Sequence, residues 1–123
     1  MSEGIRDFKD LIVWQKAMRF AKEVYTLTQS FPKEELYVLT AQVRRAAVSV
    51  PSNIAEGHTR QGRELLHYLS IARASLAETE TQLLLAIEFG YFDKGRFGEV
   101  SGLITEIRRM CVALAKKIAA PDC

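Results

Sequence analysis

Apolar residues recur at steps of three and four along nearly the whole chain, and this period constrains the fold more than any other feature. It is the spacing that places side chains on one face of an α-helix. No segment keeps the alternation of apolar and polar residues that a strand requires. The clearest run lies in the third segment and consists of Leu65, Leu69, Ala72, Leu76, Thr79, Leu83 and Ala86. The sequence therefore predicts an all-α protein.

Breaks in this pattern predict four helices, over about 11–30, 32–57, 62–90 and 93–119. The residues expected to mark their ends are Asp10 and Asp93 as N-caps, Pro32 as the first residue of the second helix, and Gly57, Gly90 and Pro121 as stops. Because the connections are short, each apolar stripe has to face its neighbour in an antiparallel pair. We expect residues 1–123 to form a single antiparallel up-down-up-down four-helix bundle.

Two further expectations concern the first two helices. The expected core stripe of the first helix is Trp14, Ala17, Met18, Ala21, Val24 and Tyr25. In the second helix, Pro51 interrupts the hydrogen-bond ladder, yet Ile54 and Ala55 continue the apolar face beyond it. We therefore predict a kink near Val48–Pro51 and a helix that runs on to about Gly57.

The composition restricts the location of the protein. No run approaches the roughly 20 apolar residues of a membrane span, and the N-terminus lacks the apolar core of a signal peptide. The expected location is the cytoplasm, with no membrane partner. The cysteines, Cys111 and Cys123, make a poor disulfide framework, and Cys111 is expected in the core.

The search for catalytic chemistry finds little. Glu64 and His67 have the Glu-x-x-His spacing of di-iron bundles, but such a site needs a second copy and two further glutamates. Glu78 and Glu80 lie two residues apart and cannot share a helix face; one of them is expected either in solvent or against an arginine across the bundle. No phosphate-binding loop or nucleophile motif is present. We expect no metal, no cofactor and no enzymatic activity.

Clustered arginines are the strongest functional signal. Arg44, Arg45, Arg60 and Arg63 lie within twenty residues of one another, and phosphate is the natural partner of grouped guanidinium groups. One end of the bundle is then expected to be positive. The alternative is that Arg44 and Arg45 pair with glutamates on a neighbouring helix or subunit.

At these same residues the sequence resembles the four-helix proteins encoded in intervening sequences of bacterial 23S rRNA genes, which are also labelled S23-type ribosomal proteins. The resembling segments are FKDL at 8–11, VWQ at 13–15, FP at 31–32 with Glu35, QVRRAAVSVPSNIAEG at 42–57, and ETQL at 80–83 with GY at 90–91. This family is similar to the accessory protein of diversity-generating retroelements, a pentamer that binds nucleic acid and a reverse transcriptase. The resemblance implies a homopentamer with basic nucleic-acid-binding surfaces. Thr79 and Ala74 depart from the family pattern, which more often has leucine and glycine there.

A surplus of large apolar residues also favours self-association. The residues that exceed the four expected stripes are Ile12, Phe20, Leu27, Tyr37, Val48, Tyr68, Leu84 and Phe89. The leading hypothesis is a non-catalytic oligomeric scaffold that binds RNA or DNA through Arg44, Arg45, Arg60 and Arg63. The alternative hypothesis is a protein–protein adaptor whose ring surface docks a partner, with the arginines structural.

Overall fold

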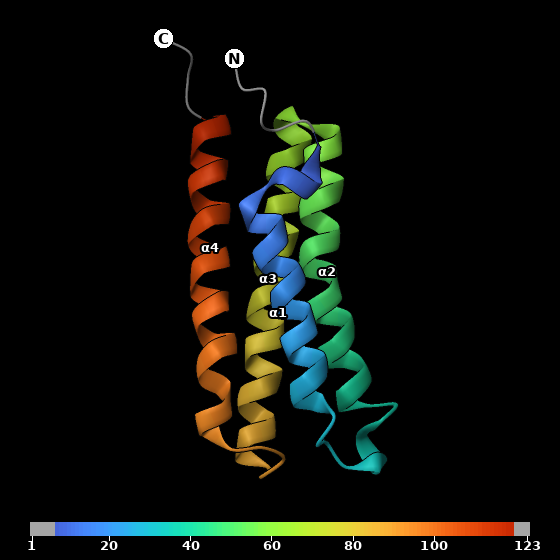
Figure 1. The fold of residues 1–123 in the computed structure, drawn as a ribbon. Helices are drawn as coiled ribbons and strands as arrows, with labels where there is room; N and C mark the ends of the chain where they lie inside the picture. Colours follow the sequence, from blue (N-terminus) through green and yellow to red (C-terminus); the bar gives the residue numbers. More distant parts are fainter. Residues whose placement is uncertain (1–6, 120–123) are drawn as a thin grey trace.

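The computed structural model describes residues 7–119, which form four long α-helices (Figure 1). These are α1 (Ile12–Thr28), α2 (Leu39–Arg60), α3 (Gly62–Glu88) and α4 (Gly98–Ala119). Three short 3-10 turns precede helices: η1 (Phe8–Asp10), η2 (Lys33–Glu35) and η3 (Lys94–Phe97). Successive helices run in opposite directions, and each packs against the next, with α4 closing onto α1. The predicted all-α four-helix bundle is confirmed, and residues 7–119 contain no strand.

The bundle has two ends that differ in their connections. The terminal end comprises residues 7–16, 56–67 and 112–119, where the connection between α2 and α3 lies (Figure 1). The loop end comprises residues 27–40 and 86–98, where η2 and η3 join the other helices. No helix in the described part of the chain has the length and apolar character needed to cross a bilayer.

The predicted start of the second helix at Pro32 is wrong. Pro32 is extended, with φ −61° and ψ 151°, and it leads into η2. The helix α2 begins at Leu39, whose backbone N–H donates to the Glu35 carboxylate at 3.3 Å. That carboxylate satisfies a backbone donor that a helix start leaves unpaired, so a start at residue 39 is stable without proline.

Both aspartates predicted as helix N-caps act elsewhere. Asp10 belongs to η1, where its carboxylate accepts the N–H of Asp7 at 3.4 Å, and α1 follows Leu11. Asp93 precedes η3 and caps no helix through its side chain, because α4 begins only at Gly98. Asp10 is the last residue of a 3-10 turn, and Asp93 directly precedes one.

The two glycines predicted as helix stops behave differently. Gly90 has φ +81° and ends α3, with its own N–H donating to the Ile87 carbonyl and that of Tyr91 donating to Ala86, both at 2.9 Å. Gly57 ends nothing, since α2 continues to Arg60. A Cβ at Gly57 would lie 2.8 Å from the Tyr68 Cβ, so this glycine allows α2 and α3 to approach closely.

The connection between α2 and α3 is a single residue. Gln61 has φ 63° and ψ 176°, a backbone conformation that residues other than glycine rarely adopt. Gly62 follows with φ +57° and already belongs to α3. The sharp reversal is therefore made by two consecutive residues with positive φ.

The helix α2 passes through Pro51 without a break. Pro51 is buried, and residues 51–55 are helical. Two residues before Pro51, the Ser49 carbonyl accepts a hydrogen bond from the Asn53 side-chain amide at 2.7 Å. The predicted continuation past Pro51 is seen, and the helix ends three residues later than expected; the kink itself stays a prediction.

The core face of α1 is rotated from the predicted stripe. Its buried residues are Val13, Ala17, Phe20, Ala21, Val24, Leu27 and Thr28. Phe20 and Leu27, expected to be surplus, are thus core residues, while Met18 and Tyr25 are 41% and 43% exposed. The helix carries two apolar stripes side by side, and periodicity alone does not tell which of them faces inward.

Candidate functional site

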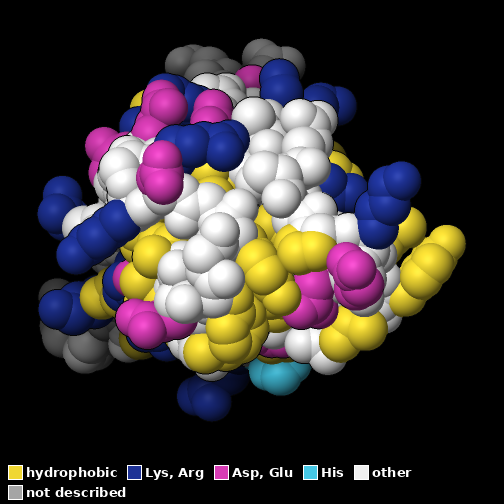
Figure 2. Space-filling view, turned by 90° about the horizontal axis from the view of Figure 1, so that it is seen from below, with side chains coloured by type: hydrophobic (Ala, Val, Ile, Leu, Met, Phe, Trp, Pro, Cys, Tyr) yellow, Lys and Arg dark blue, Asp and Glu magenta, His cyan; other side chains and the backbone are white. Residues whose placement is uncertain are grey.

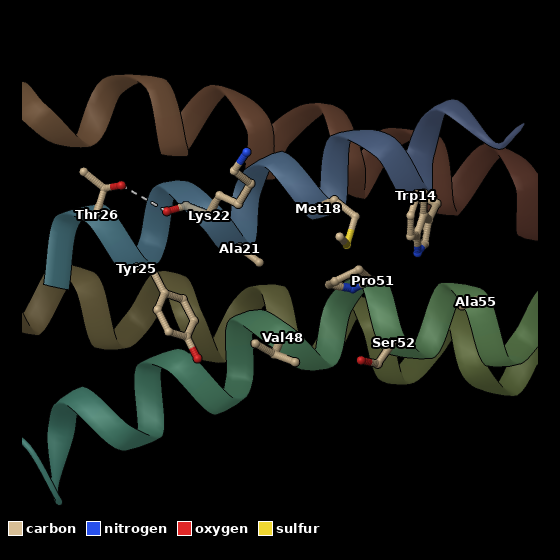
Figure 3. A pocket seen from close by; sticks show the side chains of 10 residues that line it. All are labelled: Trp14, Met18, Ala21, Lys22, Tyr25, Thr26, Val48, Pro51, Ser52 and Ala55. Atoms are coloured by element: carbon tan, nitrogen blue, oxygen red, sulfur yellow. Dashed lines mark hydrogen bonds between the residues drawn. The ribbon is translucent and has the colours of Figure 1, made fainter. Parts of the chain in front are cut away.

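An open apolar groove runs between α1 and α2 (Figure 3). It encloses about 700 Å³, and Trp14, Met18 and Tyr25 form its wall on α1. Val48, Pro51 and Ala55 form the wall on α2. This groove is the outer apolar stripe of α1 that the bundle core leaves uncovered, and the run VSVPSNIA around Pro51 supplies its second wall.

Arg44 is held by α1 and faces away from any common patch. Its Nε donates to the Thr28 hydroxyl at 2.8 Å, and its Nη2 donates to the Tyr25 carbonyl at 3.4 Å. The guanidinium carbon lies 4.5 Å from the centre of the Tyr25 ring. This geometry favours a structural role for Arg44 over a phosphate contact. Its partners are a hydroxyl and a carbonyl, however, and not the expected glutamate.

Arg45 lies on the other side of α2, over a polar seam with α3. It is exposed, and it borders a small depression together with Ser49 and Ser75, whose hydroxyls are 2.9 Å apart. Below it, the Gln82 amide donates to Gln42 at 3.4 Å, but the buried Gln82 Oε1 has no hydrogen-bond partner among the described residues. Arg45 has no carboxylate within ion-pair distance in residues 7–119.

Arg60 is bracketed by two glutamates at the terminal end. Its Nε donates to Glu56 at 2.9 Å and its Nη1 to Glu64 at 3.3 Å. The hydrogen bond to Glu56, followed by that to Glu64, raises the pKa of Arg60 above its usual value. Its guanidinium carbon also lies 5.5 Å from the Tyr68 ring centre. These two carboxylates offset the charge that Arg60 brings to this end.

Three other cations at the terminal end are free of such pairing. Arg63 is exposed on the first turn of α3, and Lys116 and Lys117 are exposed on the last turn of α4. No carboxylate in the described chain lies within ion-pair distance of any of them. The sequence reasoning missed both lysines, although a lysine pair in the last turn of the last predicted helix was visible.

The structure therefore does not bring the predicted arginines together. Arg44 and Arg60 lie on one helix sixteen positions apart, which separates them by about 24 Å along its axis. Arg60 and Arg63 flank the α2–α3 connection, while Arg44 and Arg45 lie toward the loop end and point to different neighbours. The expectation of one four-arginine patch is wrong, because a continuous helix through Pro51 holds the two pairs apart.

The loop end has a different surface. Phe31 packs against Tyr91 and Phe92 with ring centres 5.4 Å and 6.2 Å apart, and the Tyr91 hydroxyl donates to Glu35 at 2.7 Å. Outside this cluster, Tyr37 is 89% exposed. Figure 2 looks onto this end and shows hydrophobic side chains gathered across it, with acidic side chains beside them.

The candidate metal ligands Glu64 and His67 are occupied otherwise. Glu64 accepts from Arg60, and the His67 ring meets the Tyr68 ring edge-on at 5.2 Å. Within residues 7–119, no group of three or more His, Cys, Asp or Glu side chains is placed to hold a metal ion.

Burial raises the pKa of the Cys111 thiol to about 11, so this thiol is protonated at neutral pH. Glu80 receives a hydrogen bond from Arg108 of α4 at 3.0 Å.

Comparison with known proteins agrees with this fold. The family model described as 23S rRNA-intervening sequence protein matches residues 9–113. A solved structure of a protein with unknown function from the S23 ribosomal protein family of Bacteroides thetaiotaomicron is 27% identical and superposes with a TM-score of 0.77. The alignment covers 85% of this chain and 96% of that one. No curated protein matches. Because the family model extends over most of the chain, the protein belongs to the 23S rRNA-intervening sequence protein family.

Proposed function

We propose that this protein is a non-catalytic, oligomeric scaffold that binds RNA or other nucleic acid through the terminal end of its bundle. The observation that carries the proposal is a set of exposed cations, Arg63, Lys116 and Lys117, which form no ion pair with any carboxylate of residues 7–119. The glutamates near them, Glu56 and Glu64, are already paired with Arg60. Phosphate groups are the partners that such free cations attract most strongly. The cytoplasmic location expected from the sequence is part of this proposal.

The proposal revises the residues assigned from the sequence. Arg60 and Arg63 stay in the interface, and Lys116 and Lys117 join it. Arg44 leaves it because it lies far from this end and because two of its donors bind α1. Arg45 is exposed and would need a second contact on the α2–α3 side. Lysines and arginines on helix ends contact backbone phosphates, so the binding should depend little on sequence. In the pentamer implied by resemblance, copies of this end would add their contacts.

The test is a titration of structured RNA at several salt concentrations. The parent protein is compared with the triple variant Arg63→Ala/Lys116→Ala/Lys117→Ala. Each lost phosphate contact lowers the slope of log affinity against log salt by about 0.7–0.9. We therefore expect the triple variant to bind more weakly and to lose about two to three units of slope.

The matched control removes cations of the loop end. The double variant Lys33→Ala/Arg96→Ala changes the net charge in the same sense but leaves the terminal end intact, and both residues are exposed. It should bind RNA with the salt slope of the parent. If the parent binds no RNA, or if control and triple variant lose affinity equally, the nucleic-acid proposal fails.

A second candidate is a protein–protein adaptor, and the loop end favours it. Leu36, Tyr37 and Val38 are 45%, 89% and 57% exposed, and a contiguous apolar surface of this kind is typical of docking sites. Its binding would persist at high salt, where phosphate contacts weaken. Replacing Tyr37 by Ser should then abolish partner binding and leave RNA binding unchanged.

A further inference from the structure

The α1–α2 groove needs a partner whose chemistry its lining defines. Met18, Tyr25 and Val48 line the groove, and each of these large side chains is more than 40% exposed. Figure 3 shows their side chains converging from the two helices on the space between them. The distance from Trp14 to Tyr25 along α1 is about 16 Å, or roughly three helical turns. A groove of this length between two helices accepts a further helix.

The lining of the groove carries a positive charge. Lys22 is the charged residue of its lining, and Arg44 lies against the outer Tyr25 ring. Among residues 7–119, no acidic side chain lines it. The helix that fits should therefore present apolar side chains flanked by a carboxylate.

This chain itself offers such a helix face. On the outer surface of α3 near the loop end, Leu84, Leu85 and Phe89 are 46%, 45% and 56% exposed. Glu88 is exposed between them, and no described cation lies within ion-pair distance of it. We call Leu84, Leu85, Glu88 and Phe89 the α3 ridge. It spans about two helical turns, which fits within the length of the groove.

From this complementarity we infer that the groove of one molecule receives the α3 ridge of a second molecule, with Glu88 of the ridge near Lys22 of the groove. The inference deepens the oligomer named in the proposed function and rests on it, but it does not depend on nucleic acid. Groove and ridge lie on different helices and different sides of one bundle. The contact is therefore head-to-tail: the molecule that contributes its ridge keeps a free groove, and the molecule that contributes its groove keeps a free ridge, so further molecules can add.

Two single variants break the contact from opposite sides. Met18→Glu places a carboxylate in the groove, and Leu84→Glu places one on the ridge; both sites are exposed, so the fold should tolerate the change. Light scattering without RNA at micromolar concentration should give a multiple of the 13.9 kDa chain for the parent protein. Each variant alone should give the single-chain mass. Thr105→Glu, on the exposed face of α4, is the matched control and should keep the parent mass.

Mixing the two variants is the decisive measurement. Met18→Glu retains an intact ridge and Leu84→Glu an intact groove, so an equimolar mixture can form one productive contact and should give a dimer and nothing larger. The charge-swapped double variant Lys22→Glu/Glu88→Lys should recover the mass that either single reversal lowers. A single-chain mass for the parent, a parent-like mass for Leu84→Glu, or a mixture that stays monomeric would each overturn the inference. If the parent protein forms the expected oligomer but binds no RNA, only the nucleic-acid part of the proposed function fails.

Discussion

The two ends of the bundle are built on different physical principles. At the loop end, the α1–α2 and α3–α4 connections enclose aromatic rings: Phe31 and Phe92 are buried, and the Tyr91 hydroxyl donates to Glu35. At the terminal end, α2 and α3 reverse over one residue and approach each other at Gly57, and the surface is charged. The loop end thus depends on burial of large side chains, and the terminal end on close backbone packing.

This difference separates stability from binding. Exposed cations at the terminal end contribute little to folding, so they can be replaced or used for a ligand at small cost. Apolar residues at the loop end and near the α3 ridge are partly buried in the core, and those that are exposed can contact another protein. Variants of the two ends should therefore differ in the size and in the kind of their effects.

The largest effect is expected from the aromatic cluster. Phe92→Ala removes a buried ring that stacks on Phe31 at 6.2 Å, and the cavity it leaves should lower the free energy of unfolding by about 3–5 kcal/mol. The exposed Tyr37 provides the control, because Tyr37→Ala at the same end should change it by less than about 0.5 kcal/mol. Urea unfolding followed by circular dichroism measures both. Equal losses for the two variants would contradict the role given to buried rings.

A smaller loss is expected from the close approach at the terminal end. Gly57→Ala would place a Cβ 2.8 Å from the Tyr68 Cβ, which forces α3 to move and should cost about 1–3 kcal/mol. Gly102→Ala is the matched control within α4, where a Cβ would meet no atom within 4 Å. Because alanine favours helices over glycine, this control should gain up to about 1 kcal/mol. Thermal unfolding of both variants gives the sign, and a gain for Gly57→Ala would contradict the packing role.

The smallest effects compare two arginines. Arg44→Ala loses the hydrogen bond to Thr28 and the contact with the Tyr25 ring, so unfolding should become easier by about 1 kcal/mol. Arg60→Ala loses two exposed ion pairs and should leave the urea midpoint unchanged within error. If Arg60→Ala proved the more destabilising of the two, the terminal end would depend on its charges for folding.

The sequence was sufficient for the fold because the helical period persists in all four segments. It was insufficient for helix starts, since Asp10 and Asp93 resemble N-caps whether an α-helix or a 3-10 turn follows. The prediction that Gly57 ends the second helix was also wrong, because a sequence does not distinguish a glycine at a helix end from a glycine at a close contact between helices.

The candidate site was only partly accessible from the sequence. The four predicted arginines lie within twenty residues of one another in the sequence. The distance between the pair at 44–45 and the pair at 60 and 63 depends on α2 continuing through Pro51. Which of two adjoining stripes on α1 faces inward depends on how the other three helices pack. The groove at Trp14, Met18 and Tyr25 was therefore hidden within an expected core stripe.

The one-residue link at Gln61 has a consequence for how the chain folds. Residues on α2 and α3 that meet near Gly57 and Leu65 are close in sequence, so bringing them together costs little chain entropy. Contacts of this kind form early in folding. The α2–α3 hairpin should therefore serve as the nucleus onto which α1 and α4 dock, and substitutions in the hairpin should slow refolding, while substitutions in α4 should mainly speed unfolding.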